Sequence, residues 1–101
     1  SLHDALPICD ITIGANSVVS QKCYLCTGSH DFMSPHFDIT ATPIVIGEKC
    51  WLATDVFVAP GVSVGDGTVI GARSSVFKSL PANKVCRGNP AVVIRERVET
   101  D

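Results

Sequence analysis

Histidine is the side chain of this sequence best suited to acid–base chemistry near neutral pH, and its three copies stand in different contexts. His30 lies in the segment Thr-Gly-Ser-His-Asp, where a loop is predicted to leave the body of the fold. A neutral imidazole at such a place can remove a proton from a hydroxyl group. His36 lies further along that loop and is interpreted as a surface residue. His3 belongs to an N-terminal segment that we expect to play no part.

Several other side chains could assist this histidine. Asp31 adjoins it and could orient the imidazole, although successive side chains of an extended backbone point apart. Trp51, the only tryptophan, precedes a residue predicted to point inward, so its indole should point outward. There it could stack on a substrate or pack in an interface. Basic residues near the C-terminal end that could pair with phosphates are Lys78, Arg87 and Arg95.

A repeat of six residues must position these side chains. A period of six fits neither an amphipathic helix nor an alternating strand, and it is typical of hexapeptide repeats that wind into a parallel β-helix. Three hexapeptides form the three faces of one triangular coil, so residues 46–81 should make two coils, and an earlier coil should begin at Ile13. The aliphatic residues of the regular stretch are Ile46, Leu52, Val58, Val64, Ile70 and Val76.

Compact residues occupy the fifth position of each repeat unit, and Cys23 and Cys50 are among them. The five cysteines are an odd number, which argues against a closed set of disulfides. Reduced thiols that serve as small core residues fit a cytoplasmic protein. Cys23 and Cys26 form a single Cys-x-x-Cys motif without the second pair that a zinc or redox site of this kind needs.

The repeat loses its phase between Leu25 and Ile46, whose separation is not a multiple of six. Residues from about 27 to 42 are therefore predicted to form a loop inserted into the prism. Loops carried on a rigid scaffold are where functional residues concentrate.

A second loss of phase follows Leu80. The segment from Gly88 to Ala91 has the residues of a helix start, with Asn89 as N-cap and Pro90 at the first helical position. We expect a short helix at about 91–98 that covers the end of the prism.

Three segments follow from these phases. They are an N-terminal segment of doubtful origin at 1–10, a β-helix domain at 11–90 and a C-terminal helix and tail at 91–101. The chain itself is expected to be the C-terminal part of a longer protein.

Length and charge exclude several classes of protein. A chain of 101 residues forms one domain with a small core, which favours oligomerisation. A net charge of −2 without a basic block does not fit a nucleic-acid binder. No run of about 18 apolar residues is present, so no membrane span is predicted.

The sequence resembles the hexapeptide-repeat acyltransferases, and among them the sugar O-acetyltransferases that act on galactosides, maltose, nodulation factors and colanic acid. This resemblance implies an all-β fold, a left-handed parallel β-helix, and transfer of an acetyl group from acetyl-CoA to a sugar hydroxyl without a metal. It also implies a homotrimer with the active-site groove between adjacent subunits. The segments that carry the resemblance are 11–19, 27–31, 43–53, 59–76 and 88–91.

The resemblance also assigns roles to residues. His30 matches the catalytic base and Trp51 the tryptophan beside the active site, where Asp31 is a further substrate-side candidate. Phe77 stands where the family has a threonine that contacts the cofactor, and Val92 replaces a basic residue on the phosphate side. The positions that match acetyl-CoA contacts are Thr54, Ala72, Lys78 and Arg95.

Other interpretations of the same fold stay open. An enzyme similar to γ-class carbonic anhydrase needs three histidine ligands for zinc, and the third here would be His3. A non-catalytic β-helix that serves as a binding module is a second alternative, since a fold does not determine a function. An amino-sugar N-acetyltransferase or a serine acetyltransferase is a third.

Overall fold

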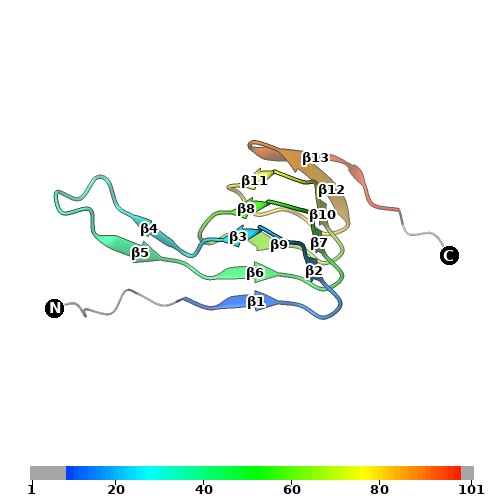
Figure 1. The fold of residues 1–101 in the computed structure, drawn as a ribbon, viewed down its shortest axis with the longest axis horizontal. Coiled ribbons are helices and arrows are strands. Elements are labelled where there is room, and N and C mark those ends of the chain that lie inside the picture. The colour runs from blue at the N-terminus through cyan, green and yellow to red at the C-terminus, as the bar shows by residue number, and fades with distance from the viewer. Residues whose placement is uncertain (1–8, 99–101) are drawn as a thin grey trace.

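Stacked short strands form a three-sided prism in the computed structural model, which describes residues 9–98 (Figure 1). Each side is a parallel sheet, and we call the sides faces A, B and C. Face A contains β1 (Ile11–Ile13), β6 (Ile44–Ile46) and β9 (Ser63–Val64). Face B contains β2 (Val18–Val19), β7 (Trp51–Leu52), β10 (Val69–Ile70) and β12 (Lys84–Gly88). Face C contains β3 (Tyr24–Leu25), β8 (Phe57–Val58) and β11 (Ser75–Val76).

The register confirms that three hexapeptides make one coil. Ile46 pairs with Val64, 18 residues further along, and the same step recurs on the other two faces. The repeating aliphatic residues point inward and are at most 2% exposed. Burying each of them stabilises the fold by about 1.5–3 kcal/mol. The members of this inner column are Ile46, Leu52, Val58, Val64, Ile70 and Val76.

Small residues follow the inward aliphatic ones because adjacent coils touch at these corners. A Cβ atom on Gly14 would lie 2.6 Å from the backbone nitrogen of Glu48, and one on Gly65 would lie 2.5 Å from that of Ala82. Both distances are shorter than real Cβ contacts, so the backbone would have to move. Close approach of the backbones thus explains the glycines of the repeat.

The fifth position of each repeat unit joins one coil to the next through side-chain hydrogen bonds. The Thr68 hydroxyl is fully buried, donates to the carbonyl of Pro81 at 2.5 Å and accepts from the N–H of Lys84 at 3.2 Å. The Cys50 thiol donates to the carbonyl of Gly65 at 3.2 Å. The compact residues at this position therefore satisfy backbone groups as well as saving space.

Between the first and second coils the chain leaves the prism as a β-hairpin. β4 (Gly28–His30) pairs antiparallel with β5 (Ile39–Ala41), and the two project away from the stack (Figure 1). This insertion lengthens the step between paired residues of β1 and β6 to 33.

The C-terminal segment corrects our expectation of a helix. β13 (Ala91–Glu96) returns antiparallel to β12, and Pro90 lies in the turn between them instead of starting a helix after Asn89. Asn-Pro pairs mark turns as well as helix starts. Here the β-branched run Val92–Ile94 favours a strand, and β12 continues the ladder of face B and offers it a partner.

The remaining expectations concern the chain ends and the membrane. Most of the predicted segment at 1–10, including His3, lies outside the described residues, as does the end of the predicted tail. Residues 9–98 contain no helical segment with the length and hydrophobicity that a membrane crossing requires.

Candidate active site

His30 ends strand β4, two residues beyond the base of the projecting hairpin at Gly28, and its side chain is exposed. Its Nδ1 lies 2.9 Å from the carbonyl oxygen of Phe37, on the return side of the hairpin. A carbonyl can only accept a hydrogen bond, so in the neutral imidazole Nδ1 carries the hydrogen. Nε2 therefore holds the lone pair that can accept a proton.

A cavity of about 340 Å³ lies beside this imidazole. Its walls are partly apolar, and Cys26 contributes a thiol that donates to the carbonyl of Gly28 at 3.1 Å. Hydrogen bonding with Cys26, together with the electrostatic influence of that group, raises the pKa of the Tyr24 phenol above its ordinary value. The lining residues are Tyr24, Leu25, Cys26, Thr27, Gly28, Ser29, His30 and Ile39. A hydroxyl group bound there would meet the only imidazole in the lining.

Asp31 shapes the hairpin. Its carboxylate oxygen Oδ1 accepts from the backbone N–H of Met33 at 2.9 Å, and its own N–H donates to the carbonyl of Asp38 at 2.8 Å. Among residues 9–98 the imidazole of His30 is oriented by a backbone carbonyl, and no hydrogen bond joins it to Asp31. The role of Asp31 on the substrate side stays a prediction.

Trp51 points outward from β7, as expected, and is 49% exposed. Its indole Nε1–H donates to the hydroxyl of Ser20 at 3.0 Å, which fixes the plane of the ring. β7 belongs to face B, whereas His30 follows β3 of face C. The two side chains line different cavities.

Most of the residues predicted to contact acetyl-CoA fall into two groups at the two edges of face C. Thr54 and Ala72 lie in the turns that lead from face B to face C. Phe77 and Lys78 directly follow β11 at the opposite edge, from which the hairpin that carries His30 leaves the prism. Arg95 stands apart on β13, paired with Val85.

An aromatic stripe runs up the outer side of face C between these groups. The rings of Tyr24 and Phe57 meet edge to face with centroids 5.7 Å apart, and Phe77 follows at 5.9 Å from Phe57. Tyr24 is 61% and Phe77 53% exposed. Sequence reasoning missed this stripe, although Tyr24 and Phe57 each stand one residue before an inward aliphatic position and could have been aligned by the repeat.

The interpretation as a zinc enzyme depended on His3, which lies outside the described residues. Within 9–98, no three His, Cys, Asp or Glu side chains converge in a way that could hold a metal ion.

The family follows from comparison with known proteins. Residues 43–78 match the family described as bacterial transferase hexapeptide (six repeats). These residues belong to the hexapeptide-repeat transferase family. The family confirms the resemblance that the six-residue period and the loop histidine indicated.

Acetyltransferases are found among both the curated proteins and the solved structures that are similar to this chain. WcaF of Escherichia coli (strain K12), named for colanic acid biosynthesis, is 85% identical over 92 residues, which are 91% of this chain and 50% of the relative. A maltose O-acetyltransferase from Clostridium difficile 630 superposes with a TM-score of 0.83 at 33% identity, covering 88% of this chain and 49% of that one. A galactoside acetyltransferase in complex with coenzyme A gives 0.80 at 37% identity, covering 85% and 44%. The chain thus spans about half the length of the curated relatives it matches.

Proposed function

We propose that this chain carries the catalytic β-helix of an acetyl-CoA-dependent O-acetyltransferase whose acceptor is a hydroxyl group of a sugar or polysaccharide precursor. The observation that carries the proposal is the imidazole of His30, held by the Phe37 carbonyl with Nε2 as its basic nitrogen beside a cavity. The relative named for colanic acid biosynthesis and the galactoside acetyltransferase bound to coenzyme A support the choice of acceptor and donor.

The chemistry is a direct transfer. Nε2 of His30 accepts the proton of the acceptor hydroxyl while the oxygen attacks the thioester carbonyl carbon, and a new C–O bond forms. The C–S bond then breaks, and the imidazolium returns its proton to the sulfur as the thiol leaves. General-base catalysis contributes about 10²–10⁴-fold in rate. Backbone N–H groups of the coil edge would stabilise the oxyanion, and positioning of both substrates would supply much of the remaining acceleration.

A complete site requires both edges of face C. Phe77 and Lys78 lie at one edge, from which the hairpin that carries His30 leaves the prism, and Thr54 and Ala72 lie at the other. A homotrimer of left-handed prisms with face C turned toward the threefold axis would bring one edge of each copy to the opposite edge of the next. The exposed aromatic stripe of face C supports this arrangement, because such a surface is stabilised when partners cover it.

The donor would lie in the groove between the two edges. The ammonium of Lys78 and the guanidinium of Arg95 suit its phosphates, and Phe77 would contact it through a ring where the family has a hydroxyl. The five cysteines are free thiols, which is consistent with the reducing cytoplasm as the compartment.

Three measurements test the proposal. Calorimetry with acetyl-CoA should show saturable binding, and thiol release should depend on an added sugar acceptor. Sedimentation should give a mass three times that of the chain. Absence of acetyl-CoA binding in the folded trimer would leave a non-catalytic binding module and reject the enzyme.

A further inference from the structure

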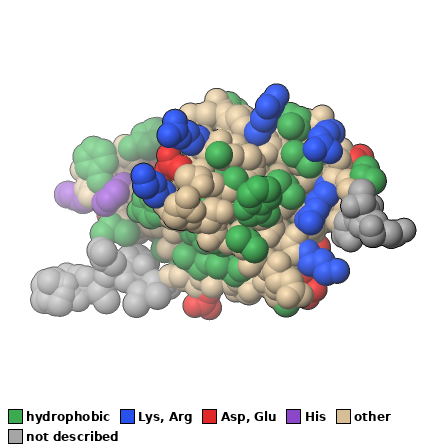
Figure 2. All heavy atoms as spheres, turned by 45° about the vertical axis from the view of Figure 1, so that its right-hand side comes forward, with side chains coloured by type: hydrophobic (Ala, Val, Ile, Leu, Met, Phe, Trp, Pro, Cys, Tyr) green, Lys and Arg blue, Asp and Glu red, His purple; other side chains and the backbone are tan. Residues whose placement is uncertain are grey.

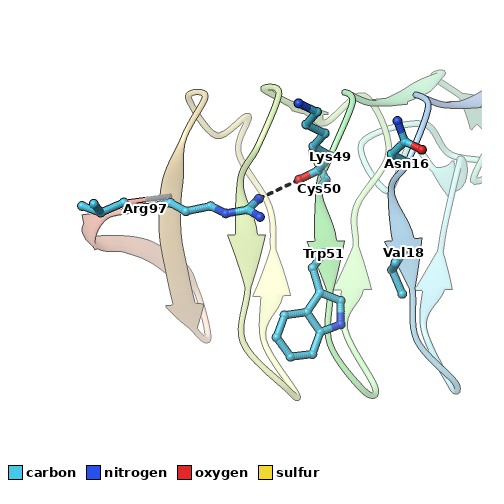
Figure 3. Close-up of a pocket in the computed structure, with 7 residues that line it drawn as sticks. Asn16, Val18, Lys49, Cys50, Trp51 and Arg97 are labelled. Carbon is cyan, nitrogen blue, oxygen red and sulfur yellow. Dashed lines mark hydrogen bonds between the residues drawn. The ribbon is translucent and has the colours of Figure 1, made fainter. Parts of the chain in front are cut away.

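A second cavity, of about 550 Å³, opens on face B at the corner between faces A and B. It shares none of its described lining with the cavity of His30. Its size falls in the range of about 300–1,000 Å³ that is usual for small-molecule sites. The residues that line it are Asn16, Val18, Lys49, Cys50, Trp51, Arg97 and Val98 (Figure 3). None of these side chains takes part in the transfer step proposed above, and only Trp51 is placed beside the active site by the resemblance.

Trp51 supplies a flat apolar surface to this cavity. The hydrogen bond from its Nε1 to Ser20 holds the indole in place, so little side-chain freedom is lost when a ligand packs on it. Val18 is the register partner of Trp51 on β2, is 56% exposed and extends the apolar floor. A rigid aromatic ring with an adjoining aliphatic side chain suits the C–H face of a pyranose ring.

Cationic and amide groups surround this floor. Arg97 donates through Nη1 to the carbonyls of Lys49 at 2.7 Å and Gly67 at 2.9 Å, which fixes the guanidinium at the rim (Figure 3). Lys49 adds an ammonium group, and the Asn16 amide offers both donors and an acceptor. Among the described residues that form the lining, none carries a carboxylate.

The rest of face B continues this charge. The sequence has eight Lys and Arg residues. All except Lys78 lie on the strands of face B, on β13 or in the segments that directly flank these strands. Four acidic residues share these segments, and they are Glu48, Asp55, Asp66 and Glu96. Asp55 approaches Arg73 at 3.9 Å and Glu96 pairs with Lys84, and the seven basic residues remain in excess. Figure 2 brings this side forward and shows basic side chains around a group of hydrophobic ones. The basic residues of this side are Lys22, Lys49, Arg73, Lys84, Arg87, Arg95 and Arg97.

We propose that this cavity binds an acidic sugar residue, with its pyranose ring on Trp51 and its carboxylate beside Lys49 and Arg97. The inference rests on the proposed function for its biological meaning. It specifies the acceptor as an anionic saccharide, whose acidic residue is held on face B while a hydroxyl group reaches His30 of a neighbouring copy. The aromatic floor favours a sugar over a simple anion, and the cations favour an acidic sugar over a neutral one.

Because Trp51 is the only tryptophan, its fluorescence reports on this cavity alone. The full chain is titrated, without acetyl-CoA, with methyl β-D-glucuronide and with the neutral methyl β-D-glucoside. We expect a saturable change with both and about fivefold tighter binding of the glucuronide. Binding of the glucuronide should weaken with added salt.

A matched pair of variants tests the contact. Lys49 and Lys22 both occupy turn positions with positive φ, 56° and 64°, which asparagine tolerates. Lys49→Asn should remove the preference for the glucuronide and leave glucoside binding unchanged. Lys22→Asn removes the same charge from the other edge of face B and should leave the preference intact.

Several results would overturn the inference. They are equal affinity for the two glycosides, equal effects of the two variants, or displacement of the glucuronide by inorganic phosphate at a similar concentration. The last result would indicate a general anion site. The binding titration contains no acetyl donor, so it does not depend on catalysis. If the glucuronide binds here but the separate acetyl-CoA assay shows no sugar-dependent thiol release, only the proposed function is rejected.

Discussion

The sharpest prediction replaces the base and keeps its hydrogen bond. In His30→Asn, the side-chain amide can still donate to the carbonyl of Phe37, where Nδ1 of the imidazole lies at 2.9 Å, but the basic Nε2 is lost. A general base contributes about 10²–10⁴-fold, and each factor of ten is about 1.4 kcal/mol. We therefore expect turnover to fall by that factor, which raises the barrier by about 3–5 kcal/mol.

Folding should change far less than turnover. His30 is exposed, and the contact with Phe37 is its one side-chain hydrogen bond among residues 9–98, so the free energy of unfolding should fall by no more than about 1 kcal/mol. Acetyl-CoA affinity should stay within about twofold, because the base acts on the acceptor. Initial rates of thiol release at saturating acceptor, thermal unfolding and calorimetry measure the three quantities.

His36→Asn is the matched control, because His36 is also exposed in the same hairpin but lies outside the lining of the cavity. It should retain turnover close to that of the unsubstituted chain. Retention of more than about a tenth of the turnover by His30→Asn, or an equal loss in His36→Asn, would refute the assignment of the base.

The other predictions concern stability and assembly. Thr68→Val leaves the N–H of Lys84 and the carbonyl of Pro81 without their buried partner and should lower the free energy of unfolding by about 2–4 kcal/mol in denaturant titrations, whereas Thr68→Ser should cost much less. Burial raises the pKa of the Cys86 thiol, and the charge of Lys84 lowers it to a smaller extent. The folded state therefore holds this proton more tightly than the unfolded chain does. The contribution of the thiol to the free energy of unfolding should be complete below about pH 8.5 and should be lost as pH rises through the folded pKa. Cys86→Ala should show a smaller alkaline decline in the same titrations, and an unchanged decline would contradict the assignment. Phe57→Ala interrupts the aromatic stripe and should shift sedimentation from trimer toward monomer with the circular dichroism preserved; an intact trimer would show that face C is not the contact.

The hexapeptide period predicted the prism because it is a local signal repeated in every coil. Each inward aliphatic such as Ile46 meets its counterpart one coil later, here Val64, so the pattern of one unit specifies its packing against the next. The exposed indole of Trp51 followed from the same alternation. The departure of the chain after Leu25 was visible as a break in that period.

The C-terminal segment shows where local signals were insufficient. Asn89 and Pro90 fit a helix start and a hairpin turn equally well, and β12 decided between them. The outer edge of β12 would be unpaired without Ala91–Glu96, which pairs along it. A β-branched segment is stabilised more by the hydrogen bonds of that ladder than by forming an isolated helical turn.

The sequence by itself determined the coil, its inward column and the histidine at the break in the repeat, because a pattern with a period of six residues marks all three. Only the three-dimensional structure decided the tautomer of His30, through the carbonyl of Phe37 in the loop that joins the two strands of the hairpin. It also decided that Trp51 faces a cavity bordered by Arg97, a residue 46 positions away in the chain that reaches back to the carbonyl of Lys49. The contact of Arg97 forms because distant segments meet on a shared face, and no local pattern of residues encodes it.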